Sequence, residues 1–493
     1  MRAPTRFLGG APLWLGLVCA MGCDVDGGNG WTPQFEPLVC PDTASTPETL
    51  GEKAMEFDRL AQALHVRPGQ AQLYSVRLAE DLATFERVDL SDNVGTWTSL
   101  YAASQAFRYA ATDDPEALDN LRRVIRGERD MLEVTGVRGL FTRVMIDPSL
   151  PGFPSGEQLA AMYPDCDLTQ GHCKRFNEVT QGPWAGWWFK NDVSKDEYAA
   201  HMFSMAVAWE LVQDPQVRED VRAVVEAVGD HLIDHELKLI DIDGRVTAYG
   251  MLYAMSFNDF PGFNALLSLS WMRLAAAVGE GRYLDFYEDC LLQRRGPLEC
   301  IHEASEQPQP YTSYLDQVGL DLGCMTNWNN HNMAQLGMYG LLRTERDPAL
   351  RSVYHQALRD ALWDAEEERP MRVQKKSLYT FFYLVNKDPT DPWPAAEAAE
   401  ALCTLQTFPA WKSYAQPVDT LSRYPTVCTD RSGDPLTDVV IPVTERTMDN
   451  FVWINNPYKL EQAPADPRTL ESPEDYLLAY WMGRYFGFLR AEM

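Results

Sequence analysis

The stretch NDVSKDEYAAH places three carboxylates and a histidine within eleven residues. Glycoside hydrolysis uses such groups in pairs, because one carboxyl group protonates the leaving oxygen while the other activates water or attacks directly. Ser194 and Glu197 have the spacing of a capping box, so we expect both to bind the backbone at a helix start. The residues of this stretch that remain as candidates for chemistry are Asp192, Asp196 and His201.

Four similar turns indicate which elements position these groups: ATDDPEAL, VQDPQVR, ERDPALR and NKDPTDP. In each turn an Asp is placed to cap a helix and a Pro to occupy its first position. The segment before each turn is nearly uncharged, and the segment after it is amphipathic. A helix that is apolar all round is buried, whereas an amphipathic helix faces solvent on one side. Each unit is therefore predicted to be an inner helix followed by an outer helix.

The chain contains five such predicted hairpins, with an outer helix left over near the start and an inner helix at the end. Pairing these two terminal helices closes a ring of six hairpins. The predicted fold class is all-α, an (α/α)6 toroid that takes up residues 46–493 as a single domain. A small inserted β-hairpin is expected at LKLIDIDGRVTAYG, with Asp-Gly as its turn. An open solenoid is the alternative, and the irregular connections argue against it.

Long loops join the predicted outer helices to the inner helices at one rim, and long loops in compact domains tend to carry function. Aromatic planes and hydrogen-bonding groups gather where these loops enter the inner helices, a combination that suits a sugar ring. Besides Asp192, Asp196 and His201, the predicted site residues are Asp259, Asn329 and His331 for catalysis, and Trp97, Trp187, Trp188, Trp328, Tyr480 and Arg484 for substrate binding, with His201 in the same binding group.

This layout resembles the six-hairpin glycosidases and the (α/α)6 polysaccharide lyases over about residues 45–490. The helix start SKDE, the DxDG hairpin and the C-terminal AYWMGRYFGF are similar to uncharacterised bacterial lipoproteins. The resemblance is one of architecture, and the fold hosts hydrolases, lyases, epimerases and proteins without catalytic activity. It implies a carbohydrate ligand, and no nucleotide-binding motif is present, so we expect no cofactor.

Three functions follow from these residues. A glycoside hydrolase, which we favour, would use two of Asp192, Asp196 and Asp259. A helix N-terminus favours ionised Asp196, so Asp259 or Asp192 is the better acid. A uronate lyase or epimerase is the second, and the resemblance implies that Asn or Arg neutralises the substrate while His or Tyr transfers protons. Its candidates are Asn329, His331, Tyr480 and Arg484. The third function is glycan binding by a lipoprotein without catalysis.

The N-terminus MRAPTRFLGGAPLWLGLVCAMGC predicts a secretory signal over residues 1–22, with an apolar core too short for a permanent span. Its last residues resemble a bacterial lipobox, so Cys23 is predicted to be lipidated. Residues 23–45 are rich in Gly and Pro and are interpreted as a flexible tether. We therefore expect a protein anchored in the cell envelope through a lipid on Cys23, with full secretion as the alternative.

Ten cysteines become eight when Cys19 leaves with the signal and Cys23 is lipidated. An even number in an exported chain suggests disulfides. Closeness in sequence favours the pairs Cys166/Cys173, Cys290/Cys300 and Cys403/Cys428, with Cys40 and Cys324 left over.

The net charge of −28 argues against a nucleic-acid partner, because phosphate binding needs a basic surface. Hydrophobic residues make up 45% of the chain and aromatic residues 11%, so the protein is globular. We expect a monomer.

Overall fold

The computed structural model describes residues 34–41, 49–67, 69–163, 173–254, 260–279, 281–296, 300–302, 309–319, 321–365, 369–412, 419–449, 451–462, 466–491 and 493. The predicted signal peptide, Cys23 and most of the tether lie outside these residues. The described chain is mostly helical with a few short strands, which confirms the all-α prediction.

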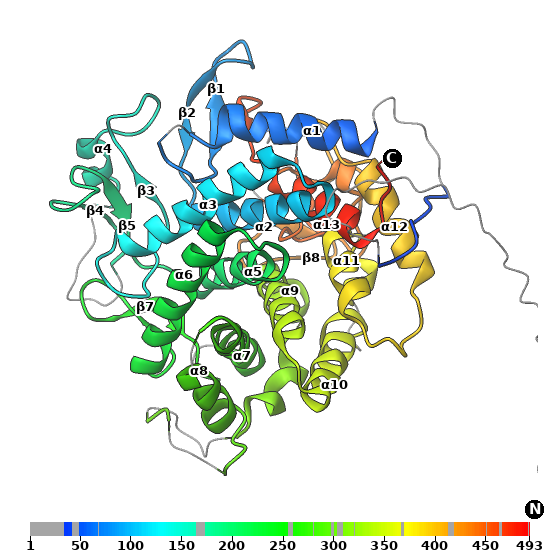
Figure 1. The fold of residues 1–493 in the computed structure, drawn as a ribbon. Coiled ribbons are helices and arrows are strands. Elements are labelled where there is room, and N and C mark those ends of the chain that lie inside the picture. Colours follow the sequence, from blue (N-terminus) through cyan, green and yellow to red (C-terminus); the bar gives the residue numbers. More distant parts are fainter. Residues whose placement is uncertain are drawn as a thin grey trace, which may run out of the picture.

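The nearly uncharged helices form the centre of the molecule and are buried on almost every side (Figure 1). Helix α2 packs against α5 and α13, α9 packs against α5, α7 and α11, and α11 packs against α13. These inner helices are α2 (Val94–Thr112), α5 (Lys195–Leu211), α7 (Pro261–Val278), α9 (Trp328–Thr344), α11 (Ser377–Asn386) and α13 (Glu474–Phe486).

The amphipathic helices lie around this centre, each packed against the inner helix that precedes it in the chain, while α1 packs against α13. This order of buried and amphipathic helices is the predicted one. The outer helices are α1 (Leu50–Leu60) continued by η1 (Ala61–His65), α3 (Pro115–Glu133), α6 (Pro215–Asp234), α8 (Gly281–Asp285) continued by η2 (Phe286–Leu291), α10 (Pro348–Ala357) continued by η5 (Leu358–Trp363), and α12 (Ala395–Gln406).

Three of the four repeated turns start a helix as predicted. The side chains of Asp114, Asp214 and Asp347 accept hydrogen bonds from the backbone at the starts of α3, α6 and α10, and a Pro follows each of them. The fourth prediction is wrong. Asp388 instead accepts from the Thr390 N–H in a local turn, and α12 begins only after Pro394.

The predicted β-hairpin is present as β6 (Lys238–Ile240) and β7 (Val246–Met251). The described chain also contains two three-stranded sheets, ordered β10-β1-β2 and β3-β5-β4, and the hairpin β8–β9, none of which the sequence predicted. Their bounds are β1 (Ser75–Leu78), β2 (Phe85–Asp89), β3 (Met145–Ile146), β4 (Phe176–Glu178), β5 (Trp188–Lys190), β8 (Cys428–Thr429), β9 (Pro435–Leu436) and β10 (Thr469–Leu470).

The short helices lie in the connections between the longer elements. They are α4 (Gly156–Ala161), η3 (Tyr311–Gln317), η4 (Gly323–Met325), η6 (Met371–Val373) and η7 (Val443–Glu445).

Two of the described disulfides connect segments far apart in the sequence. The Cys290–Cys300 prediction is confirmed, but the Cys403/Cys428 prediction is wrong, because the fold brings Cys40 to Cys403 and Cys324 to Cys428. Cys173 is disulfide-bonded, and Cys166 lies outside the described residues. Disulfides are typical of proteins in oxidising compartments outside the cytoplasm.

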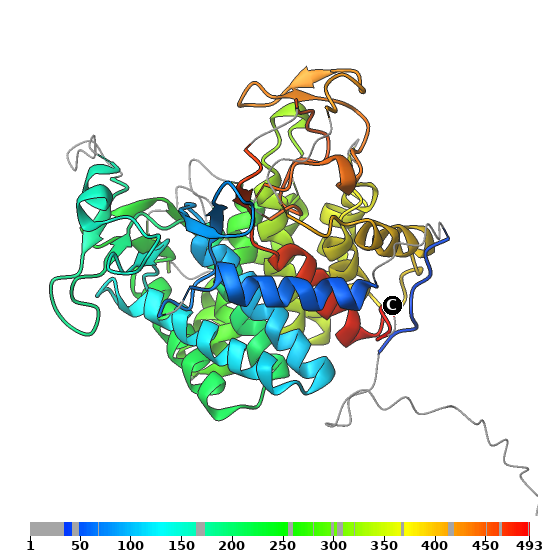
Figure 2. The same ribbon diagram turned by 90° about the horizontal axis from the view of Figure 1, so that it is seen from above.

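Hairpin β8–β9 stands out beyond the ends of the helices in Figure 2. The Cys324–Cys428 disulfide connects this hairpin to η4, just before α9.

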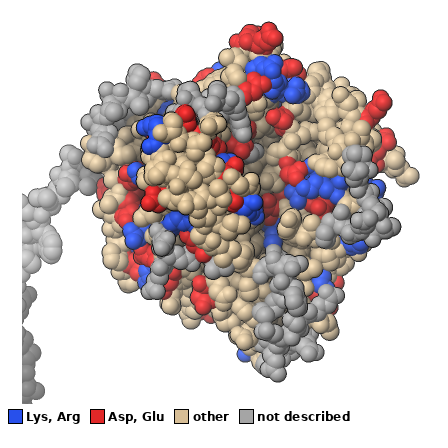
Figure 3. All heavy atoms as spheres, turned by 180° about the vertical axis from the view of Figure 1, so that it is seen from behind, with Lys and Arg blue, Asp and Glu red and all other residues tan. Residues whose placement is uncertain are grey.

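On the face shown in Figure 3, Lys and Arg side chains lie interspersed with Asp and Glu. In the part of the chain that the structure describes, every helix is too short or too polar to cross a membrane.

The disulfides that close the longest and the shortest of the three described loops give a prediction about stability. Cys40 and Cys403 are 363 residues apart, whereas Cys290 and Cys300 are 10 apart. Closing a longer loop removes more entropy from the unfolded chain, so replacing Cys40 and Cys403 by Ala is expected to lower the free energy of unfolding by about 3 kcal/mol more than replacing Cys290 and Cys300. Denaturant unfolding followed by circular dichroism measures both variants, and equal losses would contradict the expectation.

Candidate active site

A cavity of about 320 Å³ lies where the N-terminal ends of α2 and α9 meet the turn of hairpin β8–β9 and the chain that follows it. It is therefore at the end of the inner helices where the sequence analysis placed the site. Its lining comes from segments far apart in sequence: Asn93, Trp97, Thr326, Asn327, Trp328, Asn329, Asp430, Arg431, Ser432, Asp434, Arg446, Thr447, Asp449, Ile454, Asn455, Asn456, Lys459 and Glu461.

Two indole rings line the cavity. Trp97 stacks on Phe451, with ring centroids 6.1 Å apart, and its Nε1 donates to Ser91 Oγ at 3.2 Å. The ring centroids of Trp328 and Tyr458 lie 5.7 Å apart. Both rings are held by packing, so they are preorganised for a ligand with an apolar face.

Two carboxyl groups line the same cavity. Burial raises the pKa of Asp449 above its ordinary value, and burial likewise raises the pKa of Glu461. Lys459 Nζ lies 3.5 Å from Glu461 Oε1 and 2.9 Å from Asp434 Oδ2. The negative charge on Asp449 is a further cause of the raised pKa of Glu461, because ionising one carboxyl group disfavours ionising the other. The cavity thus contains two interacting acids that hold their protons nearer to neutral pH.

Some predicted residues gather at this cavity. Trp97, Trp328 and Asn329 line it. Asn329 Nδ2 donates to Asp196 Oδ2 at 3.2 Å, so Asp196 adjoins the lining without being part of it. His331 lies one helical turn further into α9, buried against the Trp328 ring.

Asp192 is held by the β-hairpin. Its Oδ1 accepts from the Ala248 N–H at 2.8 Å, and its own N–H donates to Asp241 Oδ2 at 3.1 Å. Its φ of 57° places it in the left-handed region, a conformation that Asp tolerates better than most residues. The contacts connect hairpin β6–β7 to the chain entering α5 and leave Asp192 outside the cavity lining. Asp259, the third predicted carboxylate, lies outside the described residues.

The other predicted binding residues lie elsewhere. Trp188 is in the β3-β5-β4 sheet and packs against its small apolar cluster, and Trp187 precedes it in the same segment. Tyr480 and Arg484 are in α13, where Arg484 Nη1 donates to Tyr480 Oη at 3.3 Å. Arg484 is in the last turn of α13, about 15 Å along the axis from the helix start. None of these four residues is in the lining of the cavity.

The predicted capping box at Ser194 and Glu197 is wrong. Ser194 occupies the N-cap position, but its hydroxyl donates to Asp196 and makes no capping bond. Glu197 is fully buried, and within the described part of the chain neither of its carboxyl oxygens has a hydrogen-bond partner. Burial raises the pKa of Glu197 well above its ordinary value, with Arg143 opposing the shift.

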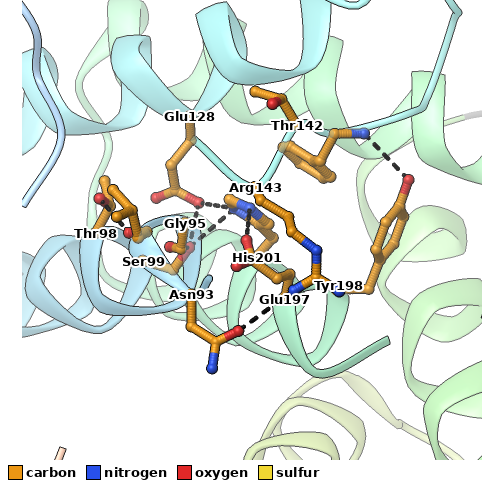
Figure 4. A network of polar contacts seen from close by, with 12 residues as sticks. Asn93, Gly95, Thr98, Ser99, Glu128, Thr142, Arg143, Glu197, Tyr198 and His201 are labelled. Carbon is orange, nitrogen blue, oxygen red and sulfur yellow. Dashed lines mark hydrogen bonds and ion pairs between the residues drawn. The ribbon is translucent and has the colours of Figure 1, made fainter. Parts of the chain in front are cut away.

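Glu197 belongs to a buried network between α2, α3 and α5 (Figure 4). His201 Nδ1 lies 2.6 Å from Glu128 Oε2, which also accepts from Ser99 Oγ and Ser204 Oγ at 2.9 Å. On its other side, His201 Nε2 lies 4.0 Å from Glu197 Oε2. His201 is therefore enclosed between two glutamates, far from solvent.

Gly95 permits the position of Glu197. A Cβ atom at Gly95 would lie 2.2 Å from Glu197 Oε2, so only glycine leaves room for the carboxyl group against the backbone of α2. Arg143 connects this network to the cavity. Its Nη1 donates to the Asp92 carbonyl at 3.1 Å and lies 3.5 Å from Oδ1 of Asn93, which lines the cavity.

Sequence reasoning missed Asp449, Glu461 and Arg446 because they lie in a long loop without helical periodicity. A signal available there is TMDNFVW, where a carboxylate lies two residues before a run of apolar and aromatic residues. Sequence reasoning also assigned Glu197 to a helix cap, although its four-residue spacing from His201 places the two side chains on one face of the helix.

No protein-family model matches this chain, and no curated protein matches it. Within the described ranges, no group of three or more His, Cys, Asp or Glu side chains is arranged to hold a metal ion.

The buried Glu197 gives a prediction about pH and stability. Its folded pKa is raised above 4.5, so between 4.5 and the folded pKa the folded state keeps a proton that the unfolded state releases. Stability is therefore lost as pH rises through this window. Glu197→Gln has no proton to release, so its unfolding free energy relative to wild type is expected to increase with pH by up to about 1.4 kcal/mol per pH unit.

Thermal unfolding of both proteins from about pH 4 to about pH 8 measures this difference. Glu219→Gln changes an exposed glutamate on α6 and is the control, expected to follow wild type at every pH. A Glu197→Gln difference that does not change with pH would show that the buried carboxyl is not the cause.

Proposed function

We propose that this chain is a glycoside hydrolase with an (α/α)6 toroid fold and that the 320 Å³ cavity is its active site. The succession of inner-helix contacts supports the toroid, because it runs from α2 through α5, α7, α9, α11 and α13 and returns to α2. An outer helix packs against each inner helix, which supports six hairpins.

The observation that carries the proposal is the pairing of Asp449 and Glu461 in one cavity with Trp97 and Trp328. Glycosidic cleavage needs one carboxyl group that keeps its proton near neutral pH and a second that acts as a base or nucleophile. Burial raises the pKa of both acids. The cavity therefore combines the acid–base chemistry with surfaces suited to sugar rings.

Asp449 is assigned as the general acid. The charge of Lys459 opposes the raised pKa of both acids, but Lys459 also donates a hydrogen bond to Glu461 and so stabilises the ionised form of that residue. In the proposed reaction, Asp449 donates its proton to the glycosidic oxygen as the bond between that oxygen and the anomeric carbon breaks. Glu461 takes the proton from the attacking water or bonds directly to the anomeric carbon. Asn93, Asn327 and Asn329 line the same cavity and supply amide groups for sugar hydroxyls.

The proposed setting is the cell envelope, with a lipid on Cys23 anchoring a monomeric domain outside the cytoplasm. The disulfides support export, because they persist in oxidising compartments. The net charge of −28 supports the proposal that nucleic acid is not a partner, and on the face shown in Figure 3 carboxylates lie among the Lys and Arg side chains.

Cleavage of a polysaccharide panel tests the proposal. The domain from residue 31 onward should release reducing ends without the ultraviolet absorbance of an unsaturated uronate. Asp449→Asn and Glu461→Gln should each lower kcat by about 100-fold or more, because each removes a group that transfers a proton or bonds to the substrate.

Asp438→Asn is the matched control, since Asp438 lies in the same loop but is exposed and outside the cavity lining. Its activity should equal that of wild type. Absorbance that rises with the reducing ends would instead identify elimination by a lyase. Binding without any cleavage would identify a glycan-binding protein, and full activity of Asp449→Asn and Glu461→Gln would place the catalytic acids elsewhere.

A further inference from the structure

One wall of the cavity contains a buried arginine with spare hydrogen-bonding capacity. Only 5% of Arg446 is exposed. Its Nε donates to the Ile441 carbonyl at 2.8 Å, and its Nη2 donates to the Gln374 carbonyl at 3.0 Å. Within the described chain its Nη1 has no hydrogen-bond partner, although the residue lines the cavity. Two backbone carbonyls therefore fix the guanidinium group, and the N–H groups of Nη1 have no acceptor among the described residues.

A buried lysine lies close to this arginine. Lys376 is 1% exposed, and its Nζ has no hydrogen-bond partner among the described residues. The Nζ atom lies 5.0 Å from the centroid of the Trp328 ring, which lines the cavity, and 5.3 Å from that of Tyr379. Burial lowers the pKa of Lys376 well below its ordinary value, and the charge of Arg446 lowers it further.

These two residues differ from the neighbouring cations. Lys459 pairs with Asp434 and Glu461, and Arg369, which also lies over the Trp328 ring, pairs with Asp321 at 2.5 Å. Neither Arg446 nor Lys376 forms an ion pair within the described residues, and the charged group that acts on Lys376 is Arg446. The buried Arg446 guanidinium thus lacks an anionic partner among the described residues, an arrangement that is costly unless a negative group completes it. A bound anion would also favour the protonated form of the neighbouring Lys376.

We infer that Arg446 and Lys376 form an anion subsite beside Trp328, and that the sugar bound in this cavity carries a carboxylate or a sulfate ester. The inference rests on the proposed function, because it names the substrate class of the same cavity. The guanidinium group suits either anion, since its planar N–H groups match the oxygens of carboxylate and sulfate. The Trp328 ring supplies the flat surface for the sugar that carries the anion.

The subsite also explains how a strongly acidic protein would accept an acidic glycan. The net charge of −28 repels polyanions at long range, but salt screens this repulsion over about 10 Å. Inside the cavity, the low dielectric strengthens the attraction to Arg446. Burial raises the pKa of Asp449, the assigned general acid, and so favours the neutral form of this residue, which does not repel a bound anion.

An array of neutral, uronate-bearing and sulfate-bearing glycans tests the inference with the domain from residue 31 onward. Wild type is expected to bind at least one acidic class and to bind its neutral counterpart about 30-fold more weakly, as for loss of a buried charged contact. Comparing the uronate-bearing with the sulfate-bearing glycans of the array shows whether the bound anion is a carboxylate or a sulfate ester. For a uronate, chemical reduction of the carboxyl groups supplies the matched neutral glycan.

Two variants remove the subsite. Arg446→Met should abolish the preference for acidic glycans, and Lys376→Met should reduce it about tenfold. Lys376→Met replaces a buried amine that has no hydrogen bond by an apolar side chain of similar length, so its melting temperature should rise or stay unchanged. A lost preference in a protein of undiminished stability cannot come from unfolding. Arg372→Gln is the control, because Arg372 is an exposed cation four residues before Lys376.

Equal binding of neutral and acidic glycans by wild type would overturn the anion subsite, and so would an unchanged acidic preference in folded Lys376→Met and Arg446→Met. Cleavage of neutral glycans with no preference for acidic ones would leave the proposed hydrolase intact while removing the subsite. Binding of neither class would overturn the subsite and the proposed function together.

Discussion

The burial of the inner helices is the constraint on which the rest of the structure depends. Helices α2, α5, α7, α9, α11 and α13 contact one another and are covered by the outer helices, so apolar side chains on nearly every face leave water. A polar group placed on such a helix must find a partner inside the protein or lose its charge. The same desolvation that stabilises the helices therefore determines the chemistry of the few ionisable groups among them.

The start of α13 shows how the protein meets this constraint. Lys412 Nζ pairs with Asp475 Oδ2 at 2.8 Å, with both side chains buried. Burial raises the pKa of Glu471 to about 7 and that of Glu474 to about 8, while the charge of Lys412 opposes both shifts. The Glu128–His201–Glu197 network meets the constraint in both ways between α2, α3 and α5. On one side His201 and Glu128 form a hydrogen bond, and on the other side the raised pKa of Glu197 favours its neutral form. Acids held in this way stabilise the fold only while they are neutral or paired.

At the cavity, loops relax this constraint. Hairpin β8–β9, tied to η4 by Cys324–Cys428, and the chain from Arg446 to Glu461 bring polar groups over the ends of α2 and α9. The aromatic rings come from the helix starts, whereas the carboxyl groups Asp449 and Glu461 come from the loop. Acids with raised pKa values line the same cavity as Arg446, a buried cation without a counter-ion among the described residues. This combination suits a ligand that has both hydroxyl and anionic groups, which is the common basis of the two proposals.

The sequence by itself determined the helices and their order, because helical periodicity and Asp-Pro starts are local signals: Asp114, Asp214 and Asp347 cap helices as predicted. It also located the end of the helices where Trp97, Trp328 and Asn329 meet. Tertiary structure alone decided the partners of each polar group. Asp192 became a hairpin contact, Glu197 became a buried acid against Gly95, and Cys403 paired with Cys40. Hydrogen bonds, desolvation and disulfides act between atoms close in space, and spacing along the chain does not record which distant segments the fold brings together.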